Sequence, residues 1–165
     1  MPGWPPSGWV LVACDVGQGD ALVLRAGPAT GVVVDAGPEP QLVDGCLDRL
    51  GVTRVPLLVL THPHADHVDG LAGVRSGREV DRVETSGVAP YGETRVVGDA
   101  TLQVLWPPSG LTVSNPNDAS VVLLAEVAGV RLLLTGDVEP VSQAALDRAW
   151  PGLTADVVKV PHHGS

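Results

Sequence analysis

Three histidines and one aspartate lie within six consecutive residues of this 165-residue chain. They are His62, His64, Asp66 and His67, and they come just after the short apolar run 57–60. Imidazole nitrogens and carboxylate oxygens together suit zinc and other first-row metals. Only five histidines occur in the chain, so chance poorly explains three in one segment. Because four ligand-type residues exceed what one ion needs from one segment, the spacing favours two metal ions.

The run 57–60 predicts a buried strand, because it is short, apolar and bounded by a proline and by the polar cluster. Such a strand delivers the residues after it to a loop at the sheet edge, where binding residues sit on a rigid scaffold. His62 and His64 are two residues apart, so they point the same way on an extended backbone. The segment 67–74 predicts a short helix that begins inside the motif.

Other ligand-type residues follow other predicted strands. Asp137 comes after the apolar run 130–135, and His162 and His163 follow the predicted strand 156–161. We expect these strands to deliver all three residues to the same edge as the histidine-rich segment.

Three aspartates near the start of the chain have either a site role or a role in capping a turn. Asp15 and Asp20 flank the tight turn 17–19, and either one could point into the site or cap the amide groups of the turn. Asp35 ends the predicted strand 31–35, and for this residue the turn role is favoured.

The remaining pattern predicts two sheets with outer helices. Strands at 9–16, 21–25 and 31–35 form an antiparallel meander, and apolar spacing predicts helices over 40–50 and 138–150. Further strands are predicted at 80–85, 94–105, 120–127 and 130–135. This order suits the α+β class and a four-layer αββα sandwich. We expect one domain over 9–165, preceded by a linker over 1–8.

The motif His-x-His-x-Asp-His after a buried strand resembles the signature of the metallo-β-lactamase fold superfamily. Four further words resemble its ComEC-type branch, which includes the C-terminal domains of DNA-internalisation competence proteins. These words are DVGQGDA at 15–21, NDASVVL at 117–123, LTGD at 134–137 and KVPHHGS at 159–165. The resemblance implies the same αββα fold, with a C-terminal part that is truncated relative to the family.

The resemblance also implies two divalent ions, zinc or manganese, bridged by the carboxylate of Asp137. Such a pair of ions lowers the pKa of a bound water, and the resulting hydroxide attacks a phosphorus or carbonyl centre. The implied ligands are His62, His64 and Asp137 for one ion, and Asp66, His67, Asp137 and either His162 or His163 for the other.

Two residues have an open role. Asn117 stands where the superfamily usually has a further histidine, so it is either a weaker ligand that favours manganese or the cap of a turn. Lys159 is the only lysine in the chain. Its ammonium group either stabilises a phosphoryl oxygen as a point charge or faces solvent. With Asp66 and Asp137, Lys159 completes the set of candidate catalytic residues.

The function that the resemblance implies is that of a phosphodiesterase or DNA nuclease. It would degrade the non-transported strand during DNA uptake in competence, with single-stranded DNA as substrate. A membrane channel portion of the same protein or of a partner would deliver the DNA. One alternative is a dinuclear metallohydrolase of another ester or amide, and another is an incomplete fragment without catalysis.

Composition limits these functions. The formal net charge of -9 argues against a nonspecific grip on nucleic acid, and four Trp and one Tyr offer few surfaces for base stacking. No apolar run reaches the ~18 residues of a membrane span. We therefore expect a soluble domain, which by resemblance lies on the outer face of the bacterial cytoplasmic membrane within a membrane protein. Cys14 and Cys46 indicate no disulfide framework, and Cys14 is expected to be a buried thiol, although pairing of the two is left open.

Overall fold

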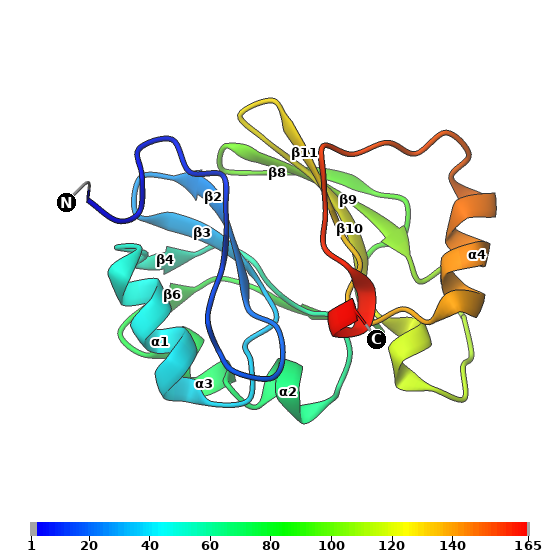
Figure 1. The fold of residues 1–165 in the computed structure, drawn as a ribbon, viewed down its shortest axis with the longest axis horizontal. Helices are drawn as coiled ribbons and strands as arrows, with labels where there is room; N and C mark the ends of the chain where they lie inside the picture. The colour runs from blue at the N-terminus through cyan, green and yellow to red at the C-terminus, as the bar shows by residue number, and fades with distance from the viewer. Residues whose placement is uncertain (1–2, 165) are drawn as a thin grey trace.

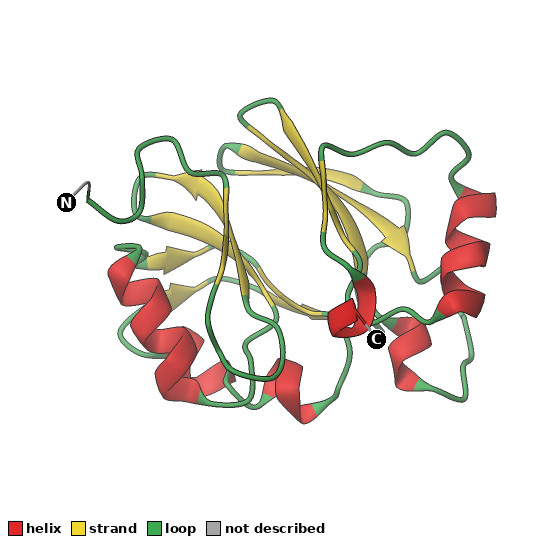
Figure 2. Ribbon diagram, in the orientation of Figure 1, coloured by secondary structure: helices red, strands yellow, loops and turns green. Residues whose placement is uncertain are grey.

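Two β-sheets pack face to face, and helices cover the outer face of each sheet (Figures 1 and 2). The computed structural model describes residues 3–164. Residues 1 and 2 of the expected linker, and Ser165 at the end of the last motif, lie outside the described residues. The four-layer αββα architecture that the sequence predicted is confirmed.

The first sheet has seven strands, ordered β1-β2-β3-β4-β6, with β5 and β7 joined through β3. Its strands are β1 Leu11–Ala13, β2 Leu22–Gly27, β3 Thr30–Val34, β4 Arg54–Val55, β5 Leu58–Leu60, β6 Glu79–Val80 and β7 Val83–Thr85. The first three form the expected antiparallel meander, whereas β3, β5 and β7 run parallel to one another. Parallel strands bring their carboxyl ends to one edge, so the residues that follow β3 and β5 meet there.

The second sheet has five strands in the order β12-β11-β10-β9-β8. Its strands are β8 Thr94–Val97, β9 Ala100–Trp106, β10 Val122–Val127, β11 Val130–Leu134 and β12 Val157–Val158. The hairpin β10–β11 confirms the prediction for these two segments. The expected strand 156–161 is much shorter than predicted, because the chain turns away after β12 into the segment Pro161–Gly164, where His162 and His163 have left-handed backbone.

Alternation along the strands separates the core into layers. Leu22 and Leu24 of β2 point between the sheets, while Val23 points to the helices outside the first sheet. On β10, Leu123 lies in the core between the sheets and Val122 lies under the outer helix of the second sheet. Successive side chains on a strand point to opposite faces, so neighbouring residues of these buried strands lie in different layers of the core.

The two long helices agree with their predicted positions. Helix α1, Pro40–Arg49, covers the first sheet, and α4, Pro140–Ala149, covers the second. Both have proline in the first turn, where the missing amide hydrogen costs no helical hydrogen bond. Within residues 3–164, none of the helices combines the length and the apolar character that crossing a bilayer requires.

The helix expected over 67–74 is instead two short helices, α2 Ala65–Val68 and α3 Leu71–Arg75. Gly70 separates them at a close contact between backbones. A Cβ atom at this position would lie 1.9 Å from the carbonyl oxygen of Ala36, so the chain passes here only as glycine. The prediction was wrong in its start and in its continuity, because this tertiary contact has no signal in local periodicity.

Cys14 and Cys46 form a disulfide that joins the segment after β1 to α1. The sequence left this pairing open, and the expectation that Cys14 is a thiol was wrong. Both residues are buried in the core between the first sheet and its helices. Two isolated cysteines, 32 residues apart, carry no spacing that reveals their contact.

Gly19 allows the turn 17–19 to pack closely against the histidine-rich segment. We therefore expect Gly19→Ala to destabilise the fold. A Cβ atom there would lie 2.0 Å from the carbonyl oxygen of Asp66, at a φ of +123°. A strained position of this kind costs about 1–3 kcal/mol. Gly17→Ala is the matched control, because Gly17 also has positive φ but has open space around its Cβ position. Urea unfolding should show the larger loss for Gly19→Ala, and equal losses would contradict the contact.

Candidate metal centre

The two sheets are hydrogen-bonded to each other at the edge where the histidine-rich segment leaves β5. The amide of Val121 donates to the carbonyl oxygen of Thr61 across this junction, at 2.9 Å. The amide of Asp137, just after β11, donates to the Ser120 hydroxyl at 3.1 Å. These bonds fix the ends of β5 and β11 relative to each other, so residues from both sheets share one site.

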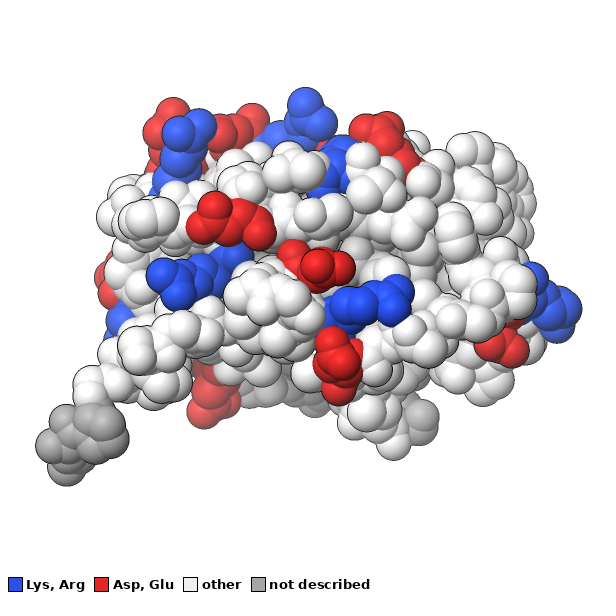
Figure 3. All heavy atoms as spheres, turned by 90° about the horizontal axis from the view of Figure 1, so that it is seen from above, with Lys and Arg blue, Asp and Glu red and all other residues white. Residues whose placement is uncertain are grey.

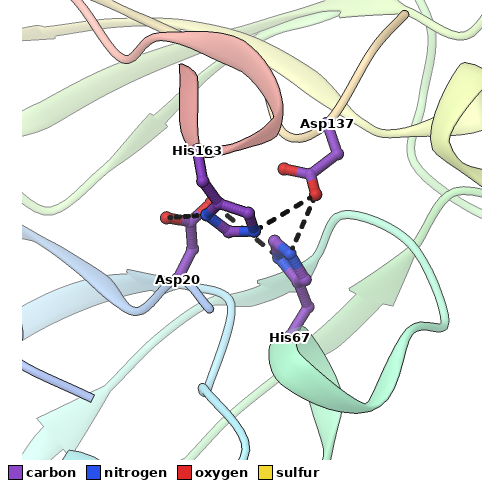
Figure 4. Close-up of side chains that lie close together, drawn as sticks. All are labelled: Asp20, His67, Asp137 and His163. Atoms are coloured by element: carbon purple, nitrogen blue, oxygen red, sulfur yellow. Dashed lines mark ion pairs between the residues drawn. The ribbon is translucent and has the colours of Figure 1, made fainter. Parts of the chain in front are cut away.

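Four side chains from four separate segments converge here, as Figure 4 shows. They are Asp20, His67, Asp137 and His163, and each offers one ligand atom within 4.8 Å of all the others. The Oδ2 atom of Asp137 lies 3.2 Å from His67 Nε2 and 3.5 Å from His163 Nε2. We call these four residues the ligand group.

Asp66 and His62 lie at the border of the ligand group. Asp66 Oδ2 is 3.4 Å from His163 Nε2 and 3.7 Å from His67 Nε2. His62 Nε2 is 3.8 Å from Asp137 Oδ2. The carboxylate of Asp137 is therefore within 4 Å of three imidazoles, which suits the bridging position expected for it.

His64 and Asp15 lie farther out. His64 is exposed, and its ring meets that of His62 edge to face at 4.8 Å between centroids. Asp15 is also exposed and is not among the ligand group that the described residues form. Of the two aspartates that flank the 17–19 turn, the structure brings only Asp20 to the candidate centre.

The two adjacent histidines near the end of the chain are separated by their backbone. His162 and His163 have φ values of +49° and +52°, a left-handed conformation that is uncommon for residues other than glycine. This conformation turns His163 toward Asp66 and Asp137. His162 instead pairs through Nδ1 with Glu139 Oε1 at 2.8 Å. The choice between the two histidines that the sequence left open therefore favours His163.

Asn117 is buried and does not itself cap the turn. Its backbone amide donates to the side chain of Asn115, which takes the capping role. Its Nδ2 donates to Glu139 Oε1 at 3.2 Å, while its Oδ1 is buried and has no hydrogen bond from the described part of the chain. An acceptor left open in this way is available to a ligand.

Lys159 points into the candidate centre and not into solvent. Only 12% of its side chain is exposed, and its ammonium group forms ion pairs with Asp20 and with Asp137 Oδ1, the latter at 3.3 Å. It also donates to the carbonyl oxygen of Gly136 at 2.9 Å. Of the two roles considered for this residue, the geometry favours the one beside the reacting groups.

Asp35 orients two of the histidines from behind. It accepts hydrogen bonds from the Thr61 amide at 2.7 Å, the Thr61 hydroxyl at 2.8 Å and His67 Nδ1 at 2.8 Å. Because the Thr61 hydroxyl donates to Asp35, it accepts from His62 Nδ1, which lies 3.0 Å away. Each imidazole therefore carries a proton on Nδ1, and each directs its Nε2 atom toward the centre.

Sequence reasoning favoured a turn role for Asp35, and the structure shows this residue under the ligand group instead. The missed signal was its position at the carboxyl end of β3, beside the carboxyl end of β5. That adjacency depends on the parallel pairing of β3 and β5, which no local pattern reveals.

The surroundings of His62 and His67 shift the pKa values of these two histidines in opposite directions. Burial lowers the pKa of His62 to about 4, and the positive charge of His67 acts in the same direction. Burial also opposes charge on His67, but the carboxylates of Asp137 and Asp35 outweigh it and raise its pKa to about 10. Burial alone raises the pKa of Asp137, yet His67 and Lys159 hold it below its usual range. His62 is therefore neutral at pH 7, while His67 is charged in the metal-free protein.

This arrangement fits a divalent metal ion. The Nε2 atoms of His62 and His67 are buried and accept or donate no hydrogen bond among residues 3–164. Imidazole nitrogen with carboxylate oxygen is a donor set that zinc and manganese accept. The second nitrogen of each imidazole is held by Thr61 or Asp35, as is usual for metal-ligating histidines.

We expect Asp35→Asn to weaken metal affinity about 10- to 100-fold, the range measured when the partner of a metal-ligating histidine is changed. The asparagine keeps the size of Asp35 but removes the charge that orients His67. Isothermal titration with manganese and with zinc measures the change. Asp44→Asn serves as a control, since Asp44 lies on α1 and pairs with Arg78, outside the ligand group. Equal affinity of Asp35→Asn and the wild type would contradict the orienting role.

The metal-free protein should lose stability as the pH rises from about 7 to about 10. The pKa of His67 is raised in the folded protein to about 10 from an ordinary 6.5. Its charged form therefore stabilises the fold fully below pH 6.5, and this contribution is lost as the pH rises through about 10. Unfolding in urea with a chelator, at stepped pH, measures the loss. The same slope in a His67→Gln variant would contradict this assignment.

Three curated relatives match nearly the whole chain. ComE operon protein 3 of Bacillus subtilis is 27% identical over 193 residues, covering 92% of this chain and 25% of that protein. The uncharacterized protein YcaI of Escherichia coli is 31% identical over 188 residues, covering 98% and 24%. Competence protein ComA of Neisseria gonorrhoeae is 28% identical over 170 residues, also covering 98% and 24%. The chain spans about a quarter of the length of these relatives.

Solved structures share the fold at low sequence identity. A metallo-beta-lactamase of Cronobacter sakazakii superposes with a TM-score of 0.61 at 15% identity, covering 91% of this chain and 79% of that one. A beta-lactamase of Chitinophaga pinensis gives 0.62 at 16% identity, covering 88% and 72%. The sequence model of the metallo-beta-lactamase superfamily matches residues 14–165, which include every residue of the ligand group. The chain therefore belongs to the metallo-beta-lactamase superfamily.

Proposed function

We propose that this domain is a metal-dependent phosphodiesterase that cleaves single-stranded DNA. The observation that supports this most strongly is the ligand group, in which Asp137 lies within 4 Å of His67 and His163 while Lys159 contacts its other oxygen. Membership of the superfamily supports hydrolysis with divalent metal ions. The ComEC-type motifs are what favours a phosphodiester over other substrates.

We propose two ions, zinc or manganese, because the candidate ligands divide into two sets. The proposed sets are His62, His64 and Asp137 for one ion, and Asp66, His67, Asp137 and His163 for the other. Asp20, a member of the ligand group, is a further candidate ligand. When bound, such ions would supply a hydroxide nucleophile at neutral pH and polarise the phosphoryl oxygens. Asn117 Oδ1 is a buried acceptor without a hydrogen bond among the described residues, and it remains a candidate ligand.

The chain's own residues supply positioning and charge. Asp35 and Thr61 hold the imidazoles of His62 and His67 with Nε2 toward the centre. Lys159, which pairs with Asp137, would place its positive charge beside a phosphoryl oxygen of a substrate bound at the metal ions, where it would offset developing negative charge.

The cellular setting that we propose is DNA uptake on the outer face of the cytoplasmic membrane. One relative bears the name competence protein, and the chain matches only about a quarter of it. The disulfide between Cys14 and Cys46 agrees with an oxidising compartment, because disulfides rarely persist in the cytosol of mesophiles. A membrane channel portion of a longer protein, or of a partner, would deliver the strand.

A dinuclear hydrolase of a small ester or amide is the second candidate, and the surface charge favours it. The net charge is -9, and acidic and basic side chains alternate on the face seen in Figure 3. Several arginines are already paired with carboxylates, among them Arg54, Arg78 and Arg95. A basic groove for DNA would need arginines that are not engaged in this way.

The test compares hydrolysis of single-stranded DNA and of bis-p-nitrophenyl phosphate with manganese, zinc or magnesium added singly. Metal content is quantified in each sample. Asp137→Asn should lose both activities, while Asp15→Asn, the same change outside the ligand group, should keep them. Hydrolysis of the small diester alone would favour the second candidate. Bound metal without hydrolysis of either substrate would contradict the proposal.

A further inference from the structure

We propose that a small pocket beside His62 holds one nucleobase of the DNA strand, next to the phosphate that is cleaved. This inference rests on the proposed function and names how that site would bind its substrate. The pocket has a volume of about 260 Å³ and is lined by Leu60, His62, Pro63, Val68, Thr85 and Ser86.

The pocket lies at the carboxyl ends of two parallel strands. Leu60 of β5 is directly opposite Thr85 of β7 in the sheet register. Val68 is the last residue of α2, and Ser86 is the first residue after β7. Crevices outside the carboxyl ends of parallel strands are where ligands bind in open α/β sheets.

His62 connects the pocket to the candidate centre. It lines the pocket, and its Nε2 lies 3.8 Å from Asp137 Oδ2. A group in the pocket would therefore contact the same histidine as a group bound at Asp137. Because the two places share a residue, the occupant is best explained as part of the same substrate.

The lining selects the chemistry of the occupant. It contains no aspartate, glutamate, lysine or arginine among the described residues, so an uncharged group fits better than a second phosphate. Leu60, Pro63 and Val68 supply an apolar surface, and the hydroxyls of Thr85 and Ser86 can pair with the polar edge of a base. Pockets for drug-sized ligands measure about 300–1,000 Å³, so this pocket suits a single ring system.

The test uses a DNA oligonucleotide with one abasic position and its intact counterpart. The wild type should cleave the intact strand beside that position with kcat/KM about tenfold higher, the scale of one lost base contact. Ser86→Leu, which fills the pocket, should abolish the difference. Val88→Leu is the matched control, because Val88 lies on the same loop, is 66% exposed and is not part of the lining.

Equal cleavage of both oligonucleotides by the wild type would overturn the inference. So would a preference for the intact strand that persists in Ser86→Leu with metal content and melting temperature unchanged. If neither oligonucleotide is cleaved, the proposed function fails. Methyl chemical shifts then test separately whether a nucleoside binds in the pocket. Titration of the metal-loaded protein with deoxyadenosine should shift the methyl signals of Leu60 and Val68, and unchanged signals would overturn the inference.

Discussion

Asp137→Ala should remove bound metal and lower the hydrolytic rate by about 10³-fold or more, since metal ions contribute several kcal/mol to such reactions and each 1.36 kcal/mol is tenfold. The carboxylate of Asp137 lies within 4 Å of the imidazoles of His62, His67 and His163. It also pairs with Lys159. Among the described side chains, only His67 has as many ion-pair partners at this site. Elemental analysis by plasma mass spectrometry, beside initial rates on both substrates, measures the effect.

Folding has to be separated from metal loss in this variant. Alanine removes one of the carboxylates that His67 and Lys159 share, and breaking a buried pair is itself destabilising by about 3–5 kcal/mol. Asp137→Asn keeps the size of the side chain and therefore controls for packing. If both variants melt cooperatively and still retain metal at the wild-type ratio, the assignment of Asp137 is wrong.

His163→Ala should lose metal, while His162→Ala should retain it. The two residues are neighbours with the same chemistry, so they form a matched pair. His163 Nε2 lies 3.4 Å from Asp66 Oδ2 and 3.5 Å from Asp137 Oδ2, whereas His162 pairs with Glu139. We expect the loss of a direct ligand to weaken affinity at least as much as a change in an outer partner, about 100-fold.

Isothermal titration with manganese and with zinc measures this difference. Circular dichroism of each variant checks that the last segment has not unfolded the domain. Loss of metal in His162→Ala with retention in His163→Ala would reverse the assignment. Equal retention in both variants would remove the terminal histidines from the site.

Much of the fold could be predicted from the sequence, because strands with two buried faces and helices with proline starts carry local signals. The hairpin β10–β11 and helices α1 and α4 are examples. The break at Gly70 and the shortening of β12 could not be predicted. The first depends on the contact of Gly70 with Ala36, and the second on the left-handed backbone of His162 and His163.

A candidate metal site could be predicted where one segment carries several ligand-type residues. The spacing from His62 to His67 indicates a metal site by itself, but Asp20 and Asp15 are indistinguishable until the 17–19 turn packs against Asp66. The roles of His162 and His163 depend on two left-handed residues that sequence patterns do not predict.

Asp35 was underestimated for a related reason. Its role depends on a hydrogen-bonded chain that passes through Thr61 to His62 and reaches His67 directly. Buried polar groups of this kind are defined by their partners, and those partners are 26 and 32 residues away in the sequence.

The most direct test of the candidate centre is calorimetric titration of the metal-free protein with manganese and with zinc at pH 7. We predict saturable binding with release of a proton, since the charged His67 must become neutral to bind metal through Nε2. The same titration of Asp137→Asn should show no saturable binding. Absence of binding in the wild type, or equal binding in the variant, would contradict the account.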